Sequence, residues 1–197
     1  MRMNLYVAFI RAINVAGHAR IKMATVRDAF TAAGCRKVRS YIQSGNVIFE
    51  SSATESANLV EKVRTKLSSM YEDEWDIMLR PAPWIEELVG AAPFKNVENP
   101  SAVKLYVVFL SQQPGIRPRL PLVSRKDGLE VIALCGNEAF VVSRRKDNGF
   151  FGIPNNFVEK ELGVTATSRN WSTIQRIARL LQTGTEKEAS APIIGSL

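Results

Sequence analysis

The 197-residue sequence contains one histidine and two cysteines, and this shortage excludes several kinds of site. Zinc and most catalytic metals need several converging His, Cys, Asp or Glu ligands, and no HExxH or CxxC pattern occurs. Cys35 and Cys135 lie far apart without metal-ligand spacing. We therefore expect no metal and no cofactor. Both thiols are expected to be buried as small hydrophobes, in a protein of the reducing cytoplasm.

Patterns that mark membrane spans and common catalytic sites are also missing. No apolar run reaches the length of a membrane span, and no GxGxxG or Walker-type phosphate loop is present. Ser44-Gly45 lacks the nucleophile-elbow pattern, and His18 is the only histidine that a Ser-His-acid triad could use. His18 is a candidate general base, with an ordinary surface-loop residue as the alternative. The sequence thus predicts no membrane association and no catalytic residue, and leaves enzymatic activity open.

The formal charge of +7 is unevenly distributed along the chain. Residues 1–40 carry +7, residues 41–100 carry −5, residues 101–150 carry +4 and residues 151–197 carry +1. Two basic regions therefore flank an acidic one. Basic regions attract anions, from small phosphates to nucleic acid, and improved solubility is the alternative explanation.

The first half shows a regular order of elements. Hydrophobic patterning predicts strands near residues 4–10, 36–42, 46–51 and 75–80, with helices near 23–33 and 59–67. This β-α-β-β-α-β order is that of the ferredoxin-like, or split βαβ, arrangement.

The second half resembles a degraded copy of the first. Strands are expected near 103–110, 128–134, 137–143 and 164–168, and a helix near 155–163, whereas residues 112–121 are too proline-rich for a full helix. We predict an α+β fold with two ferredoxin-like subdomains, at 1–80 and 100–182, the second degraded and ending in a C-terminal helix. Residues 81–99 form a helix and joint, and 183–197 a flexible tail.

The predicted topology brings two polar segments together. The first strand is central and pairs antiparallel with the third, so the loop "RAINVAGHAR" after strand one should meet the turn "QSGN" before strand three. Their polar side chains would form a binding site at one end of the sheet; the candidates are Arg11, Asn14, His18, Gln43, Ser44 and Asn46. The alternative is that Asn14, Ser44 and Asn46 only cap and close turns.

A third segment, "TSRNWSTI", contributes further candidates. Asn170 or Ser168 can cap the last helix, and the free amides of its first turn, beside Arg169, can hold an anion. If Arg169 binds a ligand, its removal should leave the ligand-free protein as stable as before. If Arg169 is instead a buried structural ion-pair partner, its removal should cost several kcal/mol. Trp171 could stack on a ring of the ligand or pack in the core.

The stretches "RAINVAGHARIKM", "YIQSGNVIF" and "TSRNWSTI" together resemble the signature of an uncharacterised, mainly bacterial family, the domain-of-unknown-function family 1697. The resemblance implies an α+β fold of two related subdomains, and it brings no activity, substrate or catalytic residue. One departure is Ala16 beside Gly17, where relatives often carry a second glycine.

The leading hypothesis is binding of a small anionic ligand, a nucleotide or a phosphorylated metabolite. The first alternative is an RNA-binding or other nucleic-acid-binding module, in which Arg144, Arg145 and Lys146 grip phosphates beside Phe150 or Phe151. The first strands, however, lack the aromatic pattern of an RNA-recognition motif. Two further alternatives are an enzyme that uses His18 and an interaction protein whose motifs serve only the joint between the subdomains. The sequence does not predict an oligomeric state.

Overall fold

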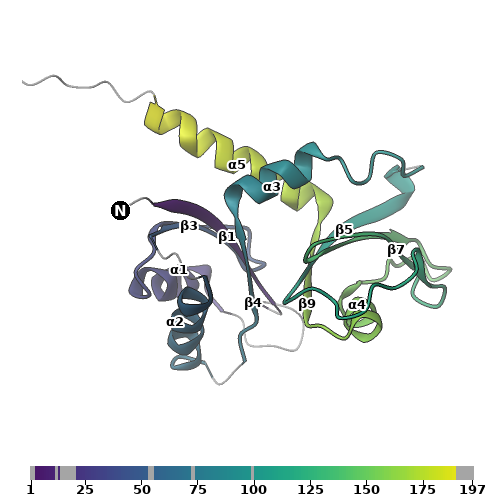
Figure 1. Cartoon of the computed structure of the whole chain (residues 1–197), viewed down its shortest axis with the longest axis horizontal. Helices are drawn as coiled ribbons and strands as arrows, with labels where there is room; N and C mark the ends of the chain where they lie inside the picture. Colours follow the sequence, from purple (N-terminus) through teal and green to yellow (C-terminus); the bar gives the residue numbers. More distant parts are fainter. Residues whose placement is uncertain are drawn as a thin grey trace, which may run out of the picture.

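The computed structural model describes residues 3–11, 13, 21–52, 56–71, 74–98 and 100–189. Two antiparallel sheets stand side by side, and helices cover the outer face of each sheet (Figure 1). Two more helices lie across the top of the space between the sheets (Figure 1). The predicted α+β class is confirmed.

The first sheet has four strands, in the order β2-β3-β1-β4. The first half of the chain consists of β1 (Asn4–Ile10), α1 (Met23–Ala32), β2 (Arg36–Tyr41), β3 (Asn46–Ser51), α2 (Ser56–Ser68) and β4 (Ile77–Pro81). Strand β1 is central and antiparallel to both β3 and β4, as the sequence predicted for the first and third strands. Helices α1 and α2 cover one face of this sheet, where apolar residues at helical spacing such as Val26, Phe30 and Val63 are buried.

The second sheet repeats this order with one strand added at its edge, β6-β7-β8-β5-β9. Its elements are β5 (Val103–Leu110), β6 (Leu122–Ser124), β7 (Leu129–Cys135), β8 (Glu138–Arg144), α4 (Asn155–Leu162) and β9 (Ala166–Asn170). No helix follows β5, because Pro114, Pro118 and Pro121 cannot donate the backbone N–H groups that a helix needs. This segment leads instead into the short edge strand β6.

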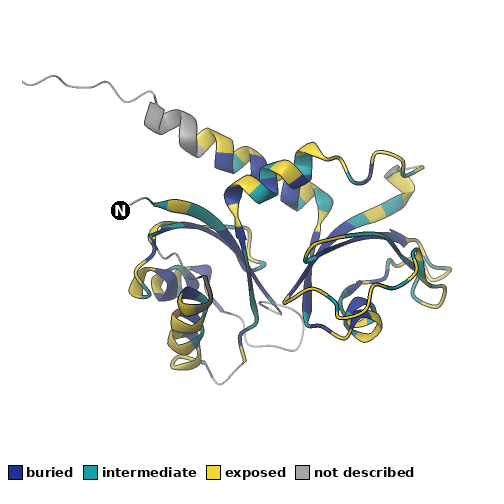
Figure 2. Cartoon of the chain, viewed as in Figure 1, coloured by how far each residue is buried: buried dark blue, intermediate teal, exposed yellow. Residues whose placement is uncertain are grey.

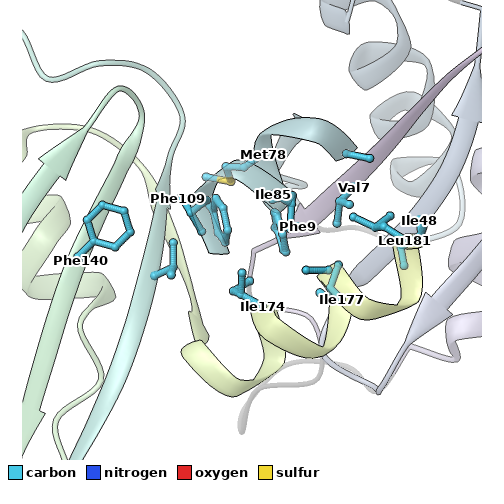
Figure 3. Close-up of a cluster of buried hydrophobic side chains, with 14 of the residues drawn as sticks. Val7, Phe9, Ile48, Met78, Ile85, Phe109, Phe140, Ile174, Ile177 and Leu181 are labelled. Carbon is cyan, nitrogen blue, oxygen red and sulfur yellow. The ribbon is translucent and has the colours of Figure 1, made fainter. Parts of the chain in front are cut away.

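Helices α3 (Ala82–Gly90) and α5 (Trp171–Ala189) follow the last strand of each half and pack against each other. A 3-10 turn (Pro100–Ala102) precedes β5. The inner faces of both sheets and the two helices share one apolar core, in which Phe9 and Phe109 stack with their ring centroids 3.9 Å apart (Figure 3). Ile174 and Ile177 of α5 extend into the same core (Figure 3). Because one core joins the two sheets, their relative position is fixed by burial of apolar surface. We call the region where the two halves meet the joint.

Two sequence expectations need correction. Cys35 is buried, as expected, and burial raises the pKa of its thiol to about 11. Cys135, in contrast, is exposed, because it ends β7 at the hairpin turn to β8. Residues 183–189 were expected to lie in a loose tail, but their backbone continues α5. The last four residues of β1 and the last five of β5 are buried, whereas helices α1, α2 and α4 show exposed residues on their outer surfaces (Figure 2).

Two absences apply to the described residues. None of their helices is both long and apolar enough to cross a membrane. Nor does any group of three His, Cys, Asp or Glu side chains among them converge as metal ligands would.

Candidate functional site

The "QSGN" turn meets the end of β1, as the topology predicted. Gly45 has φ +72°, and a Cβ atom at this position would lie 2.9 Å from the Ile10 carbonyl oxygen. The Ile10 amide donates a hydrogen bond to the Gly45 carbonyl (2.8 Å). Asn46 Nδ2 donates to the Tyr41 carbonyl (3.2 Å) and to Ser44 Oγ (2.9 Å). Asn46 and Ser44 therefore close the turn, and glycine is required for the close approach of the two backbones. Asn14 and His18 lie outside the described residues.

Arg169, from the predicted segment "TSRNWSTI", contacts the "QSGN" turn and the end of β1. It is buried, and its side chain reaches from β9 of the second sheet to the first sheet, where Nε donates to Asn46 Oδ1 (2.6 Å) and Nη2 to the Ile10 carbonyl (2.9 Å). Nη1 donates to Thr167 Oγ1 (2.8 Å) and to the Ser168 carbonyl (2.7 Å). Burial lowers the pKa of Arg169 to about 10. The guanidinium is thus surrounded by protein acceptors, and no Asp or Glu among the described residues forms an ion pair with it.

A second buried arginine, Arg80 in β4, makes the matching contacts in the opposite direction. Its Nε donates to the carboxylate of Glu138, and its Nη2 donates to the carbonyls of Leu110 (3.0 Å) and Asn137 (3.1 Å). Leu110 ends β5 and Glu138 starts β8, as Ile10 ends β1 and Asn46 starts β3. Each half therefore holds the turn of the other half through one arginine.

The aromatic rings at the centre follow the same reciprocal pattern. The guanidinium carbon of Arg169 lies 5.6 Å from the ring centroid of Phe9, and that of Arg80 lies 5.6 Å from the ring centroid of Phe109. Phe9 and Phe109 stack on each other, and each ring also contacts the arginine that belongs to the opposite half.

The sequence analysis missed Arg80 and Glu138. The repeated "LYVAF" and "LYVVF" of β1 and β5 would have indicated equivalent positions.

Arg11 forms another link between the halves. Its Nε and Nη2 donate to the two carboxylate oxygens of Glu159 in α4 (3.0 and 3.1 Å), and Nε also donates to the Ala166 carbonyl (3.2 Å). Asp76 Oδ2 lies 3.7 Å from Arg11 Nη1. Because Arg11 is half-buried and its charge is compensated, the structure ties the end of β1 to the second half at this point.

The remaining predicted residues lie around this joint. Gln43 is exposed in the turn, and Asn170 is exposed directly before α5, at the N-cap position. Trp171 packs edge-on against Phe94, with ring centroids 5.3 Å apart. Its ring is therefore part of the joint core, which is the alternative that the sequence left open.

A different concave site lies at the end of the second sheet. This hollow of about 360 Å³ is formed by the end of β6, the turn before β7 and the end of β8. We call it the basic pocket; its lining residues are Val123, Ser124, Arg125, Lys126, Gly128, Leu129, Glu130, Arg144, Arg145, Lys146 and Asp147. Residues 144–146 were predicted to grip phosphates, whereas Arg125 and Lys126 were missed because they belong to another strand connection.

The walls of the basic pocket are held together by their backbones. The Arg144 amide donates to the Gly128 carbonyl (2.8 Å), and a Cβ atom at Gly128, where φ is +66°, would lie 2.8 Å from the Arg144 carbonyl oxygen. On the other side of the turn, the Ser124 hydroxyl bonds the Asp127 carboxylate (2.7 Å). The pocket is therefore built on a fixed turn.

Comparisons with known proteins agree with this architecture. Residues 3–140 match the model of a family described as "Protein of unknown function (DUF1697)". The chain is also similar to the solved structure of the conserved bacterial protein SP0830 from Streptococcus pneumoniae, with a TM-score of 0.63 and 22% sequence identity over 91% of this chain and 99% of that one. At this identity the likeness shows the fold alone. None of the curated proteins matches the chain.

Proposed function

The chain belongs to the DUF1697 family of proteins of unknown function, and we propose that it binds a small phosphate-bearing anion in the basic pocket. The observation that supports this proposal most directly is the charge of the pocket lining. Five basic residues and two acidic residues line it. Glu130 accepts from Arg144 (3.3 Å), while no carboxylate among the described residues pairs with Arg125, Lys126 or Lys146. Concave sites lined by uncompensated cations concentrate anions.

The size of the pocket fits the proposal. Small-molecule sites commonly measure about 300–1,000 Å³, and the basic pocket lies at the lower end of that range. Val123, which is exposed, adds apolar surface beside the cations. A ligand with a few phosphate groups and a modest organic part therefore suits the site.

The joint is a weaker candidate for the same ligand. A second anion site beside Arg169 stays a prediction, because the first loop lies partly outside the described residues. The donors of Arg169 bond to protein acceptors, and Arg11 is engaged by Glu159. The contacts that are described there support a role in holding the two halves together.

Thermal unfolding tests the proposal. Inorganic pyrophosphate and ATP, titrated at low salt, should raise the melting temperature with the logarithm of their concentration. The double variant Arg125→Ser with Lys126→Ser should lose most of this shift. As a matched control, Lys62→Ser with Lys66→Ser removes the same charge from exposed positions on α2. If the two double variants respond alike, or if the wild-type protein does not respond, the pocket is not the binding site.

A further inference from the structure

The hairpin that follows β8 holds an aromatic side chain out in solvent. Phe150 is 72% exposed, although the backbone around it is fixed. The Lys146 amide donates to the Phe150 carbonyl (2.9 Å), the Phe150 amide donates to Asn148 Oδ1 (3.1 Å), and Arg145 and Phe151 form an antiparallel bridge. The exposed ring is therefore carried by a turn with its own hydrogen bonds.

This hairpin lies against the basic pocket. Phe150 is the backbone partner of Lys146, which lines the pocket. Two residues later, a Cβ atom at Gly152 would lie 2.3 Å from the Asp127 carbonyl oxygen, so only glycine lets the two chains approach there. Ser143 Oγ also donates to the Gly152 carbonyl (2.9 Å). The backbone of Phe150 therefore adjoins the pocket wall at Lys146, and its ring is exposed to solvent there.

The neighbouring Phe151 has a different position. It is half-buried, and its ring contacts Lys104 Nζ (4.9 Å to the centroid) and the guanidinium of Arg145 (5.7 Å). A cation over an aromatic face is attracted to the ring, so Phe151 restrains Arg145, which lines the pocket. Of the two phenylalanines, Phe151 is engaged by protein cations and Phe150 leaves its ring accessible.

Accessible aromatic rings beside phosphate-binding cations are suited to bases, because every nucleobase has a face that stacks on such a ring. We infer that the ligand of the basic pocket is a nucleotide unit, whose phosphates bind the cations and whose base stacks on Phe150. This inference rests on the proposed function and specifies the substrate class of that site. The nucleotide unit is either a free nucleotide or part of a single strand, since both offer the same chemistry.

The test compares ligands that share phosphates and differ in the base. Affinities for pyrophosphate, ribose 5-phosphate, ATP and a short single-stranded oligonucleotide would be measured by calorimetry at low salt. Phe150→Ala should weaken ATP or the oligonucleotide roughly tenfold and leave pyrophosphate unchanged. Phe150→Trp, which keeps an aromatic ring at this position, should bind ATP or the oligonucleotide as well as the wild-type protein does. Ile153→Ala, a matched control at a 69% exposed position of the same region, should change neither.

Each outcome separates the hypotheses. If pyrophosphate binds and Phe150→Ala has no larger effect on ATP or the oligonucleotide, the base-stacking inference is wrong and the proposed anion site stands. If pyrophosphate fails to bind, the proposed function itself is wrong. A strand is favoured over a free nucleotide if affinity rises with oligonucleotide length and falls steeply with salt. Binding only to vesicles of anionic phospholipid, weakened by Phe150→Ala and Ile153→Ala alike, would overturn the inference in favour of a membrane surface.

Discussion

The two buried arginines of the joint differ in the charge of their partners, and this difference predicts unequal costs of removal. Arg80→Ala leaves the Glu138 carboxylate, 1% exposed, without its cation. An unpaired buried charge of this kind costs about 3–5 kcal/mol of unfolding free energy. Arg169→Ala leaves only neutral acceptors, Asn46 Oδ1 and carbonyl oxygens, and it also removes a desolvated cation. The expected cost is about 1–3 kcal/mol, the penalty for buried neutral groups that lose their donor.

A second substitution should separate the two variants further. Adding Glu138→Gln to Arg80→Ala should recover part of the lost stability, because a neutral amide replaces the unpaired buried carboxylate. Arg169→Ala leaves no carboxylate without its cation, so no equivalent substitution of a charged partner should rescue it.

Urea unfolding monitored by tryptophan fluorescence measures these free energies, since Trp171 contacts Phe94 in the joint core. The reasoning is refuted if Arg169→Ala costs as much as Arg80→Ala at pH 8. It is equally refuted if Glu138→Gln recovers none of the stability that Arg80→Ala loses. If Arg169→Ala leaves the ligand-free protein as stable as the wild type, the hypothesis that Arg169 is a ligand-binding residue regains support.

Three further predictions concern single residues. Gly45→Ala should cost more unfolding free energy in urea titrations than Gly163→Ala, because both have positive φ but only Gly45 would bring a Cβ against a backbone oxygen; equal costs would contradict this. In the native protein, Cys135 should react with iodoacetamide at pH 8, while Cys35 should react only after unfolding. Because burial raises the pKa of the Cys35 thiol to about 11, the stability that this thiol contributes is full below about pH 8.5 and is lost as pH rises toward 11. Mass spectrometry and urea titrations would check both. Arg11→Ala should cost about 1 kcal/mol in urea titrations, because its ion pair is half-exposed, and a cost above 3 kcal/mol would contradict that view.

Much of the fold was predictable because it depends on local patterns. Apolar residues at alternating or helical spacing indicated the elements, and the β-α-β-β-α-β order indicated which strands pair. The end of α5 was predicted less well, because the polar residues after Gln182 give no apolar face, yet the backbone stays helical to Ala189. Exposure of Cys135 depends on its position at a hairpin turn, which residue type alone does not reveal.

The role of Arg169 could not be read from its neighbours in sequence. It was placed at the start of a helix, whereas the structure puts it inside β9, where alternating side chains point to opposite faces. Asn170 is consequently exposed and Arg169 is buried. The acceptor Asn46 lies 123 residues earlier in the chain. Only the packing of the two halves brings these residues together.

The repeat also indicates where the halves perform different roles. The reciprocal contacts of Arg80 and Arg169 use equivalent positions in both halves. They account for Asn46 of the "QSGN" turn, which accepts from Arg169, and for Ser44, which accepts from Asn46. The halves differ most after their first strands, where the first has α1 and the second has a proline-rich segment followed by β6. The basic pocket is built on β6 and on the turn that follows it. A binding role specific to one half would arise where the repeat is broken, and this is why we place the proposed ligand in the basic pocket and assign the joint to stability.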